Sequence, residues 1–162
     1  MSDMNINYHF VNDDTNDMED APAELLHRVR AGVKPMATLL LKHQNNIRLT
    51  ARSVKGAADA FRLKCCFFYA RGGRREAVVF QDGAVLRDFY DPVEIIARYR
   101  TVGVELDPVL FEVPIESFAR SVVFGDMSPY LRLPLTGLCL GYPLDETIQC
   151  IRSERGSSAV TS

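Results

Sequence analysis

The sequence predicts an α+β fold in which helices cover an antiparallel sheet, and this sheet contains a three-stranded meander. Three β-rich runs predict the meander. Residues 63–71 are apolar on both alternating faces, as expected of a strand covered on both sides, and residues 76–81 and 84–90 follow as two further runs. The intervening pairs Gly72-Gly73 and Asp82-Gly83 supply the positive φ values that tight hairpins need.

Length and composition place these strands in one ordinary domain. With 162 residues and 47% hydrophobic side chains, the chain can bury a core without metals or disulfides. We expect an acidic, largely disordered tail over 1–20, a single α+β domain over 21–152 and a second disordered tail over 153–162. Within the meander, Phe67 and Val79 are predicted to be deeply buried.

Four elements are predicted before the meander. Proline and acidic residues in a first turn predict a helix that begins near Pro22 and ends at Gly32. The run 33–41 is short enough for a strand but contains good helix formers, and we favour a helix. Residues 47–51 predict a short strand. Residues 53–61 predict a helix with Ser53 as its N-cap.

The remainder of the chain predicts a mixture of short elements. Asp91 and the following proline predict the N-terminus of a helix that ends at Gly103. The alternating run 109–113 lies between two prolines and predicts an edge strand. Residues 115–124 predict a short helix followed by a strand. Residues 138–141 predict another short strand, and a last helix is expected to begin at the next proline.

Charge is distributed in three blocks along the sequence, although the net charge is only -2. Residues 1–20 carry six acidic side chains and no Lys or Arg. Residues 21–75 carry twelve Lys or Arg against Glu24 and Asp59, and the rest of the chain is acidic on balance. Such blocks favour charged partners. The acidic tail either favours solubility or lies against the basic block.

The hairpin tip Arg71-Gly72-Gly73-Arg74-Arg75 is the sharpest local feature of the sequence. Guanidinium groups on an exposed turn suit carboxylates and phosphates. With Arg62 and Lys64 nearby, the tip predicts a basic surface for an acidic protein or for nucleic acid. The alternative is an ordinary solvated turn that pairs with Glu76 and the acidic tail.

The familiar chemical motifs are absent from the sequence. The three histidines lack metal-ligand spacing, so no metal site is predicted, and no glycine-rich phosphate or dinucleotide motif indicates a cofactor. No catalytic residue is assigned. Cys65, Cys66, Cys139 and Cys150 are interpreted as buried free thiols. Without an apolar membrane span or a secretory signal, we expect a cytoplasmic protein with no membrane partner.

Two separated segments carry a family resemblance. Residues 32–40 read Gly-Val-Lys-Pro-Met-Ala-Thr-Leu-Leu, and residues 138–146 read Leu-Cys-Leu-Gly-Tyr-Pro-Leu-Asp-Glu. In that order they resemble a bacterial family of unknown function with G-[IV]-K-P and L-G-Y-P-L segments, so the resemblance implies no mechanism. By itself, the second segment predicts a strand-to-helix corner at Gly141 and Tyr142 whose outward amides can hold an anion. The alternative is a structural turn.

The leading hypothesis is a small interaction or regulatory protein that binds a protein partner, and an acidic protein is one candidate. The first alternative is a nucleic-acid-binding protein that uses the basic block 28–75. The third hypothesis is a small enzyme with an unrecognised site. Six aromatic residues between 67 and 90 resemble the stacking platforms of single-strand binders, but their apolar surroundings favour a place in the core. The sequence leaves the oligomeric state open.

Overall fold

The computed structural model describes residues 22–44, 47–69 and 71–161. The predicted tail 1–20 lies outside these residues. The helices and strands in chain order are α2 (Pro22–Arg30), β1 (Met36–Gln44), β2 (Ile47–Leu49), α3 (Ala51–Ala60), β3 (Lys64–Tyr69), β4 (Arg75–Phe80), α4 (Pro92–Arg100), α5 (Ala119–Phe124), α6 (Pro129–Leu140) and α7 (Leu144–Thr161).

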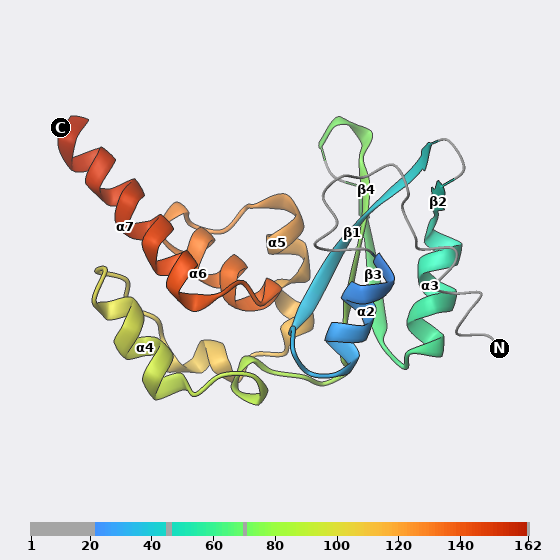
Figure 1. The fold of residues 1–162 in the computed structure, drawn as a ribbon, viewed down its shortest axis with the longest axis horizontal. Helices are drawn as coiled ribbons and strands as arrows, with labels where there is room; N and C mark the ends of the chain where they lie inside the picture. Colours follow the sequence, from blue (N-terminus) through green and yellow to red (C-terminus); the bar gives the residue numbers. More distant parts are fainter. Residues whose placement is uncertain (1–21, 45–46, 70, 162) are drawn as a thin grey trace.

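The four strands form one antiparallel sheet in the order β2-β1-β4-β3. In its register, Phe80 of β4 lies between Met36 of β1 and Lys64 of β3, and Arg75 lies between Leu41 and Tyr69 at the other end. Strand β4 is therefore central, and β3 is an edge strand. The predicted α+β class, with an antiparallel sheet covered by helices, is confirmed (Figure 1).

The third strand of the predicted meander does not form. Instead of a strand over 84–90, the structure has a 3-10 helix, η2 (Leu86–Asp88). The Asp88 carboxylate accepts a hydrogen bond of 3.0 Å from the backbone N–H of Val85, which favours a local turn over a sheet ladder. Only an isolated bridge between Val85 and Pro114 remains. Strand β1 takes the place beside β4.

Strand β1 occupies residues for which a helix was favoured. Alternate side chains of this run face opposite sides of the sheet, and both sides are buried: Ala37 and Leu39 pack on one side and Met36 on the other. Pairing with β4 over six residues and burial on two faces outweigh the weak helix propensity of the leucines. The predicted short strand after β1 is confirmed as β2.

Helices cover the two faces of the sheet from different parts of the chain. Helices α2 and α3 cover one face, where Ala77 and Val79 of β4 join the core. Helices α4 to α7 form the layer on the other face, which receives Val78 and Phe80 (Figure 1). The alternation of side chains along β4 therefore divides the molecule into two cores.

Helix N-termini follow the sequence with one correction. Asp91 caps α4 as predicted, since its carboxylate accepts from the N–H of Val93 at 3.1 Å. In α3 the cap is Thr50 rather than Ser53. The Thr50 hydroxyl accepts from the N–H of Ser53 at 3.1 Å, and the Ser53 hydroxyl accepts from the N–H of Thr50 at 3.0 Å. These reciprocal hydrogen bonds make a capping box, so the helix begins earlier in the sequence than predicted.

Two predicted strands in the C-terminal half are helical instead. The run 109–113 contributes to the 3-10 helix η3 (Pro108–Phe111), and residues 138–140 end α6. In α6 the buried residues Leu135 and Leu138 have helical spacing, whereas Pro134 and Gly137 resemble helix breakers in the sequence. The run 115–124 is also helical throughout, as a 3-10 turn followed by α5.

Helix α7 begins as predicted, but it continues through Thr161, in place of the expected tail over 153–162. It crosses α6 closely at Gly137. A Cβ atom at this glycine would lie 2.8 Å from the Oγ1 atom of Thr147, so only glycine fits there without a shift. In the described part of the chain, no helix is long and apolar enough to span a bilayer.

Candidate functional site

The candidate site follows β3, which the sequence predicts as a covered strand. Val79 of the neighbouring strand is fully buried as predicted, but Phe67 is 39% exposed and Tyr69 is 72% exposed. The prediction of a deeply buried Phe67 is therefore wrong. Its cause is the position of the strand: β3 lies at the edge of the sheet, where fewer neighbours cover a side chain.

The backbone of β3 is open along one side. Each residue from Lys64 to Tyr69 is paired with β4, and the described residues provide no other backbone hydrogen bond to this strand. The outward N–H and C=O groups of an antiparallel edge strand are a template for another strand. Phe67 and Tyr69 project from the same face of this edge, because they are two positions apart.

The hairpin tip closes one end of the open edge. Gly72 and Gly73 adopt φ values of 78° and 77°, as the predicted turn requires. Arg75 is exposed and lies opposite Tyr69 in the register. Arg74 reaches Glu76 at 3.6 Å, so the expected pairing of the tip with Glu76 occurs, although the Arg74 side chain is 60% exposed.

The other predicted basic residues lie at the opposite end of the edge. Lys64 lies opposite Phe80, five residues before Tyr69, which corresponds to about 17 Å along a strand. Arg62 precedes it and is exposed. The sequence places these bases near the tip, which is wrong for Arg62 and Lys64. The side chain of Arg71, the third predicted arginine of the tip, lies outside the described part.

The backbone of Arg62 is strained. Its φ of 60° is a left-handed conformation that favours glycine, and Arg62 has the only positive φ among the described residues other than glycine. The residue ends α3: its N–H donates to the carbonyl of Asp59 at 3.1 Å, and the N–H of Leu63 donates to Ala58 at 2.7 Å. An arginine at a position suited to glycine presents a guanidinium at the start of β3.

Charged side chains of both signs lie near the first half of β3. Burial raises the pKa of the Cys65 thiol; the nearby Lys55 ammonium opposes this rise, and the carboxylate of Asp59, which pairs with Lys55 at 3.1 Å, adds to it. Burial likewise raises the pKa of the Cys66 thiol, with an added effect of Glu116. Since residues 65 and 66 face opposite sides of the sheet, the Lys55–Asp59 ion pair lies near one face of the first half of β3 and the Glu116 carboxylate lies near the other.

The cysteines do not share one environment. Cys139 is fully buried, and this burial raises the pKa of its thiol to about 12. Cys65 and Cys66 are half-buried, and Cys150 is exposed, so the prediction of four buried thiols holds only in part. In the described part of the chain, no group of three or more His, Cys, Asp or Glu side chains could hold a metal ion.

Gly141 and Tyr142 lie between two helices, not at the predicted strand-to-helix corner. Gly141 ends α6 with a φ of 73°, and the N–H of Tyr142 donates to the carbonyl of Gly137 at 2.9 Å. Across this corner, the Nζ atom of Lys34 lies 5.9 Å from the centroid of the Tyr142 ring. The two segments singled out by resemblance therefore contact each other. They meet near Met36, at the end of β1 opposite the hairpin tip.

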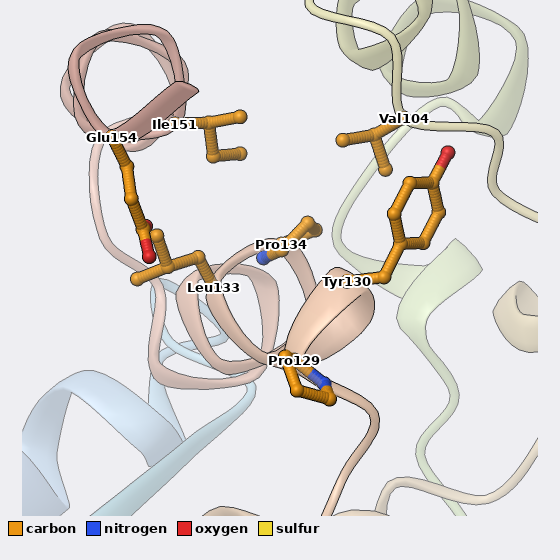
Figure 2. Close-up of a pocket in the computed structure, with 7 residues that line it drawn as sticks. All are labelled: Val104, Pro129, Tyr130, Leu133, Pro134, Ile151 and Glu154. Carbon is orange, nitrogen blue, oxygen red and sulfur yellow. The ribbon is translucent and has the colours of Figure 1, made fainter. Parts of the chain in front are cut away.

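A hollow of about 320 Å³ between α6 and α7 was not identified from the sequence (Figure 2). Glu154 and the Tyr130 ring lie on opposite sides of it, with Pro134 between them. The Tyr130 hydroxyl donates to the carbonyl of Gly103 at 2.7 Å and accepts from the N–H of Glu105 at 2.9 Å. Among the described residues that line this hollow, Glu154 supplies a carboxylate beside largely apolar walls.

The structure brings together an open strand edge, two exposed aromatic rings and basic groups at both ends of that edge. Arg74, Arg75, Arg62 and Lys64 share this edge, whereas Gly141 and Tyr142 belong to a separate corner. The exposure of Phe67 and Tyr69 was not predicted, because cysteine and aromatic residues occupy both faces of β3 and the sequence shows no alternation of polar and apolar residues there. No protein-family model matches this chain, and comparisons with curated proteins and with solved structures find no match.

Proposed function

We propose that this chain is an interaction module that binds an extended segment of a partner protein as an additional strand on β3. The observation that carries the proposal is the open edge of β3, with exposed Phe67 and Tyr69 on it. Main-chain hydrogen bonds supply affinity in this mode of recognition, and alternate side chains supply specificity.

The charges around β3 define the partner segment. Arg62 and Lys64 at one end and Arg74 and Arg75 at the other favour acidic residues at both ends of the added strand. Glu116 near Cys66 disfavours acidic residues there, whereas Asp59 near Cys65 is paired with Lys55 at 3.1 Å. The best match is an extended segment of about six residues with an apolar centre and acidic ends.

The same charges argue against a second copy of this chain as the partner. If two β3 strands paired antiparallel about Phe67, Lys64 of each copy would lie beside the hairpin tip of the other. Basic groups would then meet basic groups at both ends. Like charges in this arrangement are a common way in which edge strands avoid pairing with themselves.

A second candidate function is the binding of single-stranded nucleic acid. It is favoured by two exposed aromatic rings on one face, Phe67 and Tyr69, with Arg75 beside Tyr69. The Glu116 carboxylate near Cys66 favours the peptide over a continuous phosphate backbone, because a nucleic acid would carry negative charge along the whole edge.

Fluorescence anisotropy with a labelled peptide tests the proposal. The probe has the sequence Asp-Asp-Val-Thr-Val-Thr-Val-Asp-Asp, and a matched peptide carries proline in place of the central valine. Proline removes a backbone donor and disrupts strand pairing. We expect saturable binding of the first peptide at about 0.15 M salt and much weaker binding of the second.

Charge reversal locates the site. The double variant Arg74→Glu with Arg75→Glu is expected to bind the probe roughly tenfold more weakly and with less salt dependence. Arg132→Glu with Arg152→Glu makes the same change in net charge on exposed residues of α6 and α7 and should leave binding unchanged. Equal binding of the proline peptide would refute strand addition. Tighter binding of an oligothymidine that Arg75→Glu abolishes would favour the second candidate instead.

A further inference from the structure

The sheet has a second open edge, on β1. Strand β2 pairs only with residues 42–44 of β1, so among the strands that the structure describes, residues 36–41 have a neighbour on the β4 side alone. The described residues provide no other backbone hydrogen bond to this part of β1. An added strand could occupy about six residues here, or about 20 Å, before it meets β2.

A hollow of about 240 Å³ lies along this open edge. Three consecutive residues of β1, Ala37 to Leu39, contribute to its lining. Consecutive residues of a strand face opposite sides of the sheet, so a hollow that touches all three lies at the strand edge and not over one face. Leu25 of α2 and Leu140 at the end of α6 supply buried apolar walls. The hollow is therefore a slot between helices with a strand edge along it.

Lys34 and Tyr142 mark one end of the slot. Both residues line the hollow, and the Lys34 ammonium lies 5.9 Å from the Tyr142 ring centroid. Gly141 permits this approach, because a Cβ atom at that position would lie 3.2 Å from the Cγ atom of Lys34. Lys34 precedes the first residue of β1, Met36, by two positions. The slot thus has a cation at the start of β1 and β2 at its other end.

The position of the cation selects a direction for the added strand. A strand antiparallel to β1 would end its chain near Lys34, whereas a parallel strand would begin there. A terminal carboxylate is attracted by the ammonium, and a terminal amine is repelled by it. Antiparallel addition with a free C-terminus is therefore the favoured arrangement.

We propose that this slot binds the C-terminal end of an extended, apolar peptide, antiparallel to β1, with its terminal carboxylate at Lys34. The partner is a protein whose last four to six residues are β-branched or apolar and uncharged. Alternate side chains would contact Leu25 on one face and Leu140 on the other. This site is on the opposite side of the sheet from β3 and does not depend on the function proposed for β3.

Two peptides that differ only at their C-terminus test the proposal by fluorescence anisotropy with the full chain. Both have the sequence Ser-Val-Thr-Val-Val with a fluorophore on the N-terminal amine; one ends in a free carboxylate and the other in an amide. We expect the acid to bind about tenfold more tightly than the amide, as for a charge-assisted hydrogen bond. Equal affinity for both peptides, or no binding of the acid at millimolar concentration, would overturn the proposal.

Substitution of the cation locates the effect. Lys34→Met keeps the aliphatic stem and removes the charge, so it should abolish the preference for the acid, whereas Lys34→Arg should retain it. Lys55→Met on α3 removes an exposed ammonium elsewhere and should change nothing. If Lys34→Met does not fold, loss of the preference in Tyr142→Ala and its retention in Lys34→Arg are required. A preference that survives Lys34→Met in a folded protein would refute the site.

The proposals for the β3 site and the β1 slot can be tested independently. The double variant Arg74→Glu with Arg75→Glu should leave the preference for the free acid unchanged, because its substitutions lie at the tip end of β4. Conversely, Lys34→Met should not weaken binding of the acidic-ended peptide on β3. An N-methylated version of the C-terminal peptide should lose affinity, since strand addition needs its backbone donors. Unchanged affinity after N-methylation would contradict strand addition on β1.

Discussion

The two faces of the sheet are covered to different extents, and the candidate β3 site lies where the covering is incomplete. On the face of α4 to α7, Phe68 packs edge-to-face against Phe124 of α5, with ring centroids 5.8 Å apart. On the face of α2 and α3, the adjacent residues Phe67 and Tyr69 are exposed. Exposed aromatic residues in a row mark a surface that another molecule can cover. The difference shows that one apolar strand can pack into a core on one face and remain exposed on the other.

The difference follows from how each face receives its helices. Helix α3 leads directly into β3 and ends beside the first residues of this strand, where Lys55 and Asp59 influence Cys65. Phe67 and Tyr69, farther along β3, remain exposed on this face. The other face receives four later helices, which pack against one another as well as on the sheet (Figure 1).

The largest effect expected from this difference is on stability. Phe80→Ala should lower the free energy of unfolding by about 3 to 5 kcal/mol, because the ring is 1% exposed in the core shared with α4 to α7. Phe67→Ala should lower it by about 1 kcal/mol or less, since that ring is already 39% exposed. Urea denaturation of both variants measures the two values. Similar losses for the two variants would show that Phe67 is covered in solution.

The helix layer allows a second test, at the crossing of α6 and α7. Gly137→Ala should destabilise the protein by about 1 to 3 kcal/mol, although alanine favours helix, because the new methyl group would lie 2.8 Å from the Thr147 Oγ1 atom. Thr147→Ala removes this atom and the neighbouring Cγ2, so it should restore most of the stability in the Gly137→Ala background. Thermal unfolding of the single and double variants measures the coupling. A stabilising Gly137→Ala would mean that the helices are farther apart.

Alkaline pH should also act on the helix layer. Cys139 has a pKa of about 12 in the fold, against an ordinary value of 9.0, because its thiol is fully buried. A folded-state pKa above the unfolded value stabilises the fold below pH 9, and this contribution is lost as the pH rises from 9 toward 12. The expected loss is about 1.4 kcal/mol for each pH unit in that window.

Cys139→Ala isolates this contribution from those of other groups. Cys65 and Cys66 have raised thiol pKa values, and burial also raises the phenol pKa values of Tyr90 and Tyr99 above 10.0. The variant retains these four groups, so its stability should fall less steeply than that of the wild type between pH 9 and 10. Urea midpoints at pH 8, 9 and 10 provide the comparison. Identical slopes would show that Cys139 ionises without disturbing the fold.

The sequence predicted the fold where local signals were strong. The N-termini of α2 and α4, the β3–β4 hairpin and the start of α7 were all predicted from turn and capping residues. Strand β1 was not, because its leucines suit a helix and only its pairing with β4 makes it a strand. The strand predicted over 84–90 does not form because a local interaction prevails over sheet pairing: the carboxylate of Asp88 closes a turn with the N–H of Val85.

The candidate sites depend on strand order, which residue spacing does not reveal. Arg62 and Lys64 precede β3 and Arg74 and Arg75 follow the turn, so their separation along one edge appears only when β3 is an edge strand. The contact of Lys34 with Tyr142 joins residues far apart in the sequence. In both cases a long-range arrangement, not a motif, creates the site.

The smallest predicted effect concerns Arg62, where stability and binding should change in opposite directions. Arg62→Gly removes a left-handed arginine with a φ of 60°, which costs about 1 to 2 kcal/mol, and part of this gain is offset by the greater freedom of glycine in the unfolded chain. A net stabilisation of about 0.5 to 1 kcal/mol is expected, measured by urea denaturation.

The same variant should bind the acidic-ended peptide more weakly, because it removes a charge at the start of β3. Arg62→Asn is the matched control: asparagine tolerates the left-handed conformation but lacks the guanidinium, so it should lose affinity equally. If Arg62→Gly is instead destabilising, the arginine supports the fold through the hollow that it lines with Phe61 and Gln81. A stabilised variant with unchanged affinity would remove Arg62 from the β3 site and leave Lys64 as the base at that end.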